Sequence, residues 1–333
     1  MRLDYLKEIF KNQPSYRLKQ IKQAIFKDLV ENWSQVTTLP LSLRAELNQK
    51  TPLTTEGTIF AAQNSQVIKA LITLSDGEKI ETVLMRYANG RNTVCLSSQV
   101  GCSLKCVFCA TGKMGFKRNL TSWEIVLQAL FFARFLKKND PNSKGVTNVV
   151  FMGMGEPFLN YENVLESIRV LNDKDGFNLG IRHISISTVG ITKGIRKLAG
   201  ENLGINLAIS LHAPTDQLRQ ELIPVNQKYP LKKVLSAVED YISKTHRKVM
   251  FEYVMIKGVN DSDEDAYRLA ILVKGKLAMV NLIAYNPTGI FKPSSSDRIR
   301  NFRNILEQKG IAVTQRFRFG RRIRAACGQL AVK

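Results

Sequence analysis

Four of the five cysteines in this 333-residue chain lie in one short stretch, VCLSSQVGCSLKCVFCATG. Cys102, Cys106 and Cys109, here called the cysteine trio, follow a C-x3-C-x2-C spacing. Cys95 lies seven residues before the trio, and Cys327 lies near the other end of the chain. Three thiolates can hold an iron–sulfur cubane and leave one iron open to a substrate or cofactor. A zinc site with Cys95 as fourth ligand and a simple cluster of buried thiols are the alternatives, although zinc sites more often use paired C-x2-C elements.

The trio follows the first of a series of predicted strands that alternate with helices from residue 93 onward. Strand patterns are TVCLSS, NVVFMG, HISIST, INLAIS, KVMFEYVM and VNLIAYN, and the helical segments between them include SWEIVLQALFFARFLKK and YENVLESIRVLND. This order predicts an α/β fold with a parallel sheet and a site at the carboxyl ends of its strands. About six βα units are too few for a closed eight-stranded barrel. We therefore predict a partial (β/α)6 barrel over residues 93–333, with a doubly wound sheet as the alternative.

Two smaller regions precede the barrel. Residues 1–55 are predicted to form a helical accessory domain, in which YRLKQIKQAIFKDLV places four apolar residues on one face: Leu18, Ile21, Ile25 and Phe26. Residues 56–92 contain VIKALITL and KIETVLMRY, followed by NTVCLSS, with SDGE and ANGR between them. The Asp-Gly and Asn-Gly pairs are typical of tight hairpins, so this region is predicted to form a β-meander that leads into the barrel.

The charge of the chain indicates a polyanionic partner. Its 49 Lys and Arg against 28 Asp and Glu give a net charge of +21 and a pI near 9.9. Nucleic acid is the most plausible partner, with a basic host proteome as the alternative, and charge does not separate RNA from DNA. No apolar run reaches the roughly 18 residues that a membrane helix needs, and the N-terminus lacks the apolar core of a signal peptide. We expect a cytoplasmic protein, where clustered cysteines favour metal binding or catalysis over structural disulfides.

Several longer motifs identify a family. They are VCLSSQVGCSLKCVFCATGKMGFKRNL, NVVFMGMGEPFLN, SISTVG, AISLHAP, VNLIAYNP and AACGQL. Together they closely resemble the RlmN/Cfr family of RNA adenine methyltransferases, a branch of the radical S-adenosylmethionine (SAM) superfamily. The resemblance implies a [4Fe-4S] cluster on the cysteine trio, whose open iron binds SAM and yields a 5′-deoxyadenosyl radical. It also implies methylation of an adenine of 23S rRNA at C2 or C8, with tRNA as a further substrate of many RlmN enzymes.

The same resemblance assigns residues to SAM binding. In GMGEP, it places Gly155 and Glu156 at SAM, with the Glu156 carboxylate accepting hydrogen bonds from the amino group. The other positions that match SAM-binding residues of the family are Ser187, Ser210, Leu211, His212 and Asn286. Without the family resemblance, GMGEP would be interpreted as an ordinary βα loop, Ser187 as a strand-end hydroxyl, His212 as a structural histidine and Asn286 as part of a turn before proline.

A carrier mechanism accounts for the other two cysteines. Adenine C2 and C8 are electrophilic, so SAM cannot methylate them directly. The resemblance implies that a first SAM methylates the sulfur of Cys327 and that a radical from a second SAM activates this methyl group. The carbon then joins the adenine, and Cys95 releases the RNA by forming a transient disulfide with Cys327. Glu81 in KIETV corresponds to the family's proton acceptor, the electron comes from a flavodoxin or ferredoxin, and we expect a monomer.

One stretch departs from the family pattern. In FGRRIRAAC, three arginines stand where relatives usually carry acidic residues: Arg321, Arg322 and Arg324. Beside the Cys327 thiol they would stabilise a thiolate or bind phosphate. Pro157 and the GFKRNL segment favour C2 over C8 specificity. The alternatives are a C8-specific, Cfr-like enzyme and a non-catalytic iron–sulfur or zinc RNA-binding module, which would leave GMGEP, SLHAP and the two remaining thiols unexplained.

Overall fold

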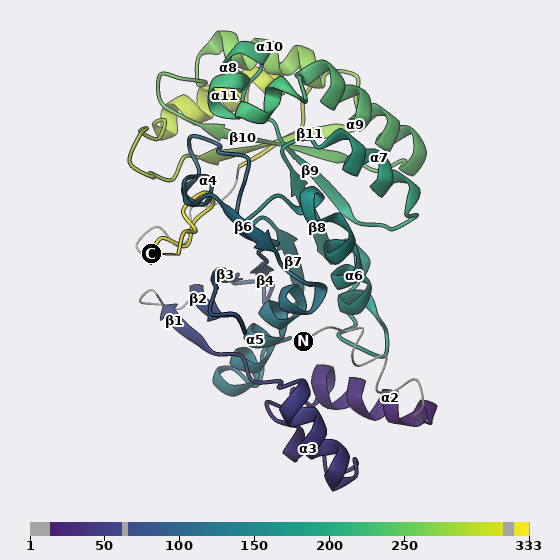
Figure 1. Ribbon diagram of the computed structural model, residues 1–333. Coiled ribbons are helices and arrows are strands. Elements are labelled where there is room, and N and C mark those ends of the chain that lie inside the picture. The colour runs from purple at the N-terminus through teal and green to yellow at the C-terminus, as the bar shows by residue number, and fades with distance from the viewer. Residues whose placement is uncertain (1–13, 62–65, 316–322, 333) are drawn as a thin grey trace.

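The computed structural model describes residues 14–61, 66–315 and 323–332 (Figure 1). Ten strands form one sheet in the order β1-β2-β3-β4-β7-β8-β9-β10-β11-β12. Their bounds are β1 Gly57–Ala61, β2 Val67–Thr73, β3 Lys79–Arg86, β4 Asn92–Cys95, β7 Asn148–Phe151, β8 Ile184–Thr188, β9 Asn206–Ser210, β10 Val249–Met255, β11 Ala278–Ala284 and β12 Val313–Gln315.

The strands from β4 to β12 form the barrel portion of this sheet. They are parallel, and each pairs with the next strand of this sheet in chain order; β5 (Gln99–Gly101) and β6 (Phe116–Asn119), between β4 and β7 in the chain, form a separate two-stranded sheet. Such an order does not reverse, as it would in a doubly wound sheet, and the two edges of the sheet do not meet within the described residues. The prediction of a partial barrel is therefore confirmed. Apolar strand residues such as Val149, Ile186 and Leu282 are buried against the helices.

Helices cover the outer face of the sheet in Figure 1. The longest, α5, begins with a capping box in which Thr121 and Glu124 satisfy each other's backbone N–H groups. In the part of the chain that the structure describes, no helix is both long and apolar enough to cross a bilayer. The helices of the barrel are α5 Ser122–Asn139, α6 Tyr161–Asn172, α7 Thr192–Gly200, α8 Asp216–Leu222, α9 Leu231–Thr245, α10 Asp263–Val273 and α11 Ser296–Gln308.

The β-meander extends the barrel sheet with antiparallel strands. β3 pairs with β4, so the meander and the barrel share one sheet. Strand β1, which pairs with β2 at the sheet edge, was not predicted from the sequence. All five residues of β1 are exposed, so the strand lacks the apolar alternation that would reveal it.

The N-terminal helices pack beside α5, at the bottom of Figure 1. They are α2 (Ser15–Lys22), which continues into a π-helical turn, and α3 (Leu41–Lys50). Ile21 and Ile25 are buried as predicted, whereas Leu18 is 40% exposed and does not belong to the packed face. Arg134 of α5 donates hydrogen bonds to the carbonyl oxygens of two N-terminal residues, which fixes this region against the barrel.

Candidate active site

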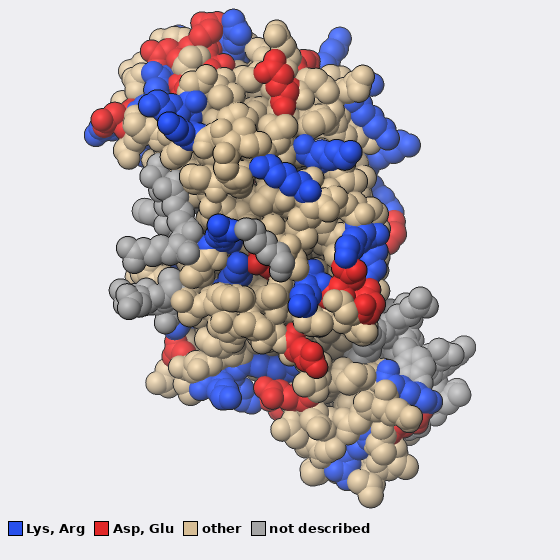
Figure 2. Space-filling view, turned by 60° about the vertical axis from the view of Figure 1, so that its left-hand side comes forward, with Lys and Arg blue, Asp and Glu red and all other residues tan. Residues whose placement is uncertain are grey.

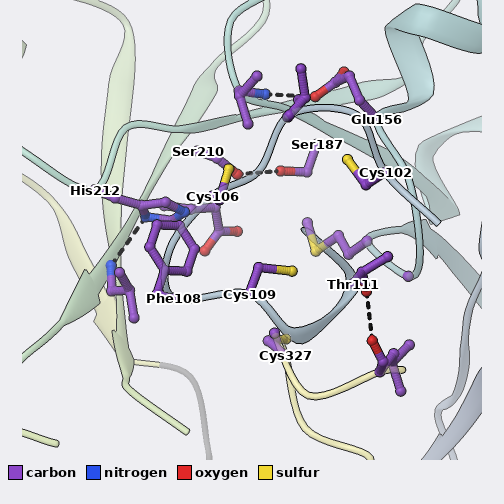
Figure 3. A pocket seen from close by; sticks show the side chains of 18 of the residues that line it. Cys102, Cys106, Phe108, Cys109, Thr111, Glu156, Ser187, Ser210, His212 and Cys327 are labelled. Atoms are coloured by element: carbon purple, nitrogen blue, oxygen red, sulfur yellow. Dashed lines mark hydrogen bonds between the residues drawn. The ribbon is translucent and has the colours of Figure 1, made fainter. Parts of the chain in front are cut away.

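A pocket of about 170 Å³ lies inside the sheet, at the carboxyl ends of the parallel strands. Figure 3 shows the cysteine trio on one loop around this pocket, with Cys327 approaching from the C-terminal segment. The position agrees with the expected location of a barrel active site. Its walls include the predicted site residues Gly155, Glu156, Ser187, Ser210, His212 and Asn286.

The loop of the cysteine trio is held by backbone hydrogen bonds. It follows strand β5 (Gln99–Gly101) and precedes the short helix α4 (Ala110–Met114). The Cys102 N–H donates to the Gly115 carbonyl at 2.7 Å, and the Val107 N–H donates to a carbonyl at the end of α8. Gly101 has φ +77°, and a Cβ there would lie 1.9 Å from the Gly115 oxygen. Only glycine therefore allows the chain to enter the loop along this path.

The environment of the trio suits metal coordination. Burial raises the pKa of Cys102 to about 12, and the charges of Glu156 and Cys109 add to this effect. Burial also raises the pKa of Cys106 well above its usual range, so without a metal the thiols of Cys102 and Cys106 are protonated at neutral pH. Iron would supply the positive charge that makes thiolates stable in this setting. The residues therefore fit an iron–sulfur cluster.

The arrangement of the three sulfur atoms bears on whether the trio would hold a single metal ion or a cluster. The described residues contain no group of three or more His, Cys, Asp or Glu side chains placed to hold one metal ion. In a cubane, each cysteine ligates a different iron, so the trio need not converge on a single position. Phe108, which precedes Cys109 in the trio loop, places its ring centroid 5.1 Å from that of the His212 imidazole in an edge-to-face contact.

The GMGEP loop places a buried carboxylate in the pocket. Gly155 has φ +96°, and a Cβ there would lie 2.6 Å from the Cβ of Gln99, so the close approach requires glycine. The Glu156 carboxylate accepts hydrogen bonds from the Phe158 N–H at 3.0 Å and the Val189 N–H at 2.9 Å. Despite these bonds, burial raises the pKa of Glu156 to about 7. A ligand amino group would stabilise the ionised form.

The predicted serines and histidine lie at the ends of neighbouring strands. The hydroxyl oxygens of Ser187 and Ser210 are 3.2 Å apart, on β8 and β9 (Figure 3). His212 has φ +60°, and its Nδ1 accepts a hydrogen bond from the Val254 N–H at 3.2 Å. Burial lowers the pKa of His212 to about 3, so the imidazole is neutral. Leu211 is fully buried and is not among the residues that line the pocket.

The C-terminal segment (residues 323–332) docks against the helix that follows the trio. The Ala110 N–H donates to the Gly328 carbonyl at 2.7 Å. The Thr111 hydroxyl donates to the Leu330 carbonyl at 2.6 Å. Thr111 was not predicted from the sequence, although its position in CATG, directly after the trio, is the signal that could have revealed it.

Further hydrogen bonds hold the same segment to the YNP loop. The Asn286 side chain donates to the Cys327 carbonyl at 3.2 Å, and the Gln329 side chain donates to the Pro287 carbonyl at 3.0 Å. Asn286 therefore positions the backbone of Cys327 and also lines the pocket. The structure thus brings Cys327 to the trio across more than 200 residues of sequence.

Cys95 and Glu81 are buried near the site but do not line the pocket. Cys95 ends β4, and its carbonyl accepts a hydrogen bond from the Thr82 hydroxyl at 2.8 Å. All five cysteines are described, and none is in a disulfide. Arg324 has φ +50°, whereas Arg321 and Arg322 lie outside the described residues.

Glu81 connects the meander to the C-terminal segment. Its Oε1 lies 2.6 Å from the Lys69 ammonium, and its Oε2 accepts a hydrogen bond from the Ala331 N–H at 2.9 Å. Both side chains of the ion pair are buried. Glu81 is therefore not an exposed strand residue. Its ion-pair partner Lys69 was not predicted from the sequence, because Lys69 stands in the otherwise apolar strand VIKALITL.

Replacing Lys69 with methionine should destabilise the protein strongly. The change removes the cation and leaves the Glu81 carboxylate buried, which typically costs about 3–5 kcal/mol. Chemical denaturation would measure the free energy of unfolding. The double variant Lys69→Met/Glu81→Leu should recover much of the loss, because neither charge remains. Equal stability of Lys69→Met and the unchanged protein would contradict a structural role for the pair.

Comparisons with known proteins agree with this geometry. A family model described as the Radical SAM superfamily matches residues 96–270. The "Probable dual-specificity RNA methyltransferase RlmN" of Dictyoglomus thermophilum is 44% identical, over 98% of this chain and 94% of the relative. The "Ribosomal RNA large subunit methyltransferase N" of Nitrosopumilus maritimus is 43% identical, over 95% of this chain and 92% of the relative.

A solved structure has the same fold over nearly the whole chain. It is the crystal structure of a radical SAM methyltransferase from Sphaerobacter thermophilus, with a TM-score of 0.94 and 44% sequence identity. The match covers 99% of this chain and 97% of the other. It extends well beyond the superfamily domain and includes the C-terminal segment that carries Cys327. The chain belongs to the RlmN/Cfr family of the radical SAM superfamily.

Proposed function

We propose that this protein methylates an adenine ring carbon, C2 in preference to C8, in 23S rRNA and also in tRNA. The observation that carries the proposal is the position of Cys327 in one pocket with the cysteine trio. A thiol beside the cluster site can receive a methyl group and then present it for activation. A non-catalytic RNA-binding module would have no use for this arrangement.

The pocket residues divide into groups with separate roles. The cysteine trio would hold a [4Fe-4S] cluster, and Glu156 would bind the amino group of SAM. Ser187 and Ser210 offer hydroxyl groups to the rest of SAM. When bound, the cluster and SAM supply the electron and the radical that activate an otherwise inert methyl group. Two SAM molecules are needed per turnover, since one is the methyl donor and the other the radical source.

Cys327 and Cys95 would act in sequence. The Cys327 sulfur carries the one-carbon unit until it is bonded to the adenine. The Cys95 thiolate then attacks the Cys327 sulfur, so that a sulfur–sulfur bond forms as the sulfur–carbon bond to the RNA product breaks. Cys327 lines the pocket, whereas Cys95 is buried at the end of β4 and does not line it, so we propose that the C-terminal segment moves toward β4 in this step.

Glu81 remains the proposed acceptor of the adenine ring proton. In the present arrangement, its two carboxylate oxygens are engaged by Lys69 and by the Ala331 N–H. Action as a base therefore requires the Ala331 contact to open. The same opening would release the C-terminal segment for the reaction with Cys95.

The surface supports an RNA substrate. Figure 2 shows lysine and arginine side chains spread over one face of the molecule, with fewer aspartate and glutamate side chains among them. Lys105 on the trio loop and Lys113 on α4 are exposed, and neither forms an ion pair with a described carboxylate. Both lie within a few residues of the cluster site, where RNA phosphate would pass.

RNA binding should weaken steeply as salt rises. Each phosphate contact releases counterions, and the slope of log affinity against log salt falls by about 0.7–0.9 per contact. Fluorescence anisotropy with a 23S rRNA fragment at several salt concentrations would measure the affinity and hence this slope. Lys105→Ala and Lys113→Ala should each reduce the slope by about one contact. Lys232→Ala is the matched control, because Lys232 is exposed on the outer helix α9, and this variant should leave the slope unchanged. An affinity that does not change with salt would show that the charge is incidental.

The proposed reaction is tested by mass spectrometry of rRNA and tRNA from a deletion strain. The strain should lack 2-methyladenosine, and the unchanged gene should restore it, whereas a Cys327→Ala gene should not. Loss of 8-methyladenosine instead would assign the protein to C8 chemistry. Full retention of both modified nucleosides in the deletion strain would refute the proposed function.

A further inference from the structure

Arg219 is a fully buried arginine that none of the roles above uses. It lies on α8 and has 0% exposure. A buried guanidinium is normally paired with a carboxylate. Here, no described carboxylate forms an ion pair with Arg219, and its hydrogen bonds within the described residues all go to neutral oxygen atoms. The protein therefore keeps a nearly uncompensated positive charge in its interior.

The guanidinium joins the strand ends that form the SAM pocket. It donates to the carbonyl oxygens of Leu211 at 3.1 Å and Ser210 at 3.4 Å, and to that of Val189. Ser210 ends β9, and Val189 follows β8 directly. The fixed fork of the guanidinium suits this role, because several donors act at once in one plane.

The guanidinium also donates hydrogen bonds to the segment that follows α8, and it thereby connects this segment to the strand ends. Nη1 donates to the Asn226 side-chain oxygen at 2.6 Å and to the Tyr229 carbonyl at 3.2 Å. Asp216, on the same helix, acts on Arg219 only over a longer range, and its Oδ1 accepts hydrogen bonds from the Asn226 amide and the Leu231 N–H. Burial lowers the pKa of Arg219 to about 10, so the charge persists at neutral pH.

The charge lies close to the cysteine trio. The end of α8 contacts the trio loop, where the Leu222 carbonyl accepts a hydrogen bond from the Val107 N–H at 3.1 Å. Leu222 and Cys106 belong to the same buried apolar cluster. The guanidinium lies close enough to Cys106 for an electrostatic interaction between the two side chains.

We propose that Arg219 is a positioning residue that also acts electrostatically, because it holds the strand ends of the SAM pocket and makes the adjacent cluster easier to reduce. Reduction adds one negative charge to the cluster, and a fixed positive charge in a low-dielectric interior favours that state. The inference rests on the proposed cluster but not on the identity of the RNA substrate.

A redox titration of the anaerobically reconstituted protein, monitored by electron paramagnetic resonance, tests the proposal. Arg219→Gln should make one-electron reduction about tenfold less favourable, a shift of about 59 mV to lower potential. Arg219→Lys keeps the charge, so its potential should stay near that of the unchanged protein. Its affinity for SAM and its melting temperature should fall, because an ammonium group cannot replace the fork.

Arg134→Gln is the matched control. Arg134 is partly buried and also donates to backbone carbonyl oxygens, but it lies on α5 and holds the N-terminal region. This variant should lose thermal stability without a change in cluster potential. A potential shift in Arg134→Gln equal to that in Arg219→Gln would show that general destabilisation is responsible.

A second variant covers the case in which Arg219→Gln does not fold or load a cluster. The double variant Asp216→Asn/Asn226→Asp moves a carboxylate to the position that accepts from Arg219, and it keeps a donor and an acceptor between positions 216 and 226. The new carboxylate neutralises the charge and leaves the guanidinium in place. It should lower the potential in the same direction. An unchanged potential in either cluster-loaded variant overturns the proposal. The titration needs no RNA, so a protein that methylates nothing would still show the shift.

Discussion

Replacement of Cys95 by alanine should leave RNA covalently attached to the protein through Cys327. The variant retains the cysteine trio, the SAM site and the carrier sulfur, so the carbon transfer to adenine can proceed. It lacks the thiolate that breaks the bond between Cys327 and the RNA product. The complex should appear on a denaturing gel as a slowly migrating band that nuclease treatment removes.

Cys327→Ala is the matched variant and should fail earlier. Without the carrier sulfur, neither methylated RNA nor a covalent complex should form. Loss of folding would give inactivity in both variants without the band, so iron content and melting temperature must be measured alongside. A folded, cluster-loaded Cys95→Ala protein with normal turnover and no covalent complex would contradict the assigned role of Cys95.

Single alanine variants of the cysteine trio should lose the cluster and all reductive cleavage of SAM. Each thiolate of the trio would hold one iron, and the trio loop carries no further cysteine to replace it. Cys95 does not line the pocket, and Cys327, which does, is held on the C-terminal segment by backbone hydrogen bonds. Iron and sulfide analysis would measure cluster content, and 5′-deoxyadenosine formation with a reductant would measure cleavage.

The two mechanistic cysteines supply the controls for this experiment. Cys95→Ala and Cys327→Ala should keep the cluster and still form 5′-deoxyadenosine, since neither residue is assigned as a ligand. Full activity of the unchanged protein with zinc alone would exclude the cluster assignment.

The barrel could be predicted because its buried strands are short apolar runs separated by amphipathic helices. NVVF and HISIST show this pattern clearly, and both are strands of the sheet. Strand β1 could not be predicted in the same way, since all its residues are exposed at the sheet edge and show no alternation of buried and exposed positions. Leu18 was wrongly assigned to the packed face for a related reason. Helical periodicity identifies which residues share a face, but it does not show which residues of that face are covered by the rest of the protein.

The site was predictable as a set of motifs but not as a set of contacts. Spacing alone was enough to group the trio. The docking of the C-terminal segment depends on hydrogen bonds between residues far apart in sequence, such as Thr111 and Leu330. Arg219 stands in TDQLRQEL, a segment with the composition of an exposed helix, and nothing in that pattern reveals that the side chain is buried.

The distance in sequence between the trio and Cys327 also determines the order in which the two parts of the site are synthesised. During translation, the trio is synthesised more than 200 residues before Cys327. An iron–sulfur donor could thus meet its ligands while the carrier thiol does not yet exist. A nonsense mutation just before codon 327 would then yield a chain that retains the sheet and the trio but lacks the acceptor. Such a truncated product would consume reducing power and SAM in making radicals that have no methyl group to attack.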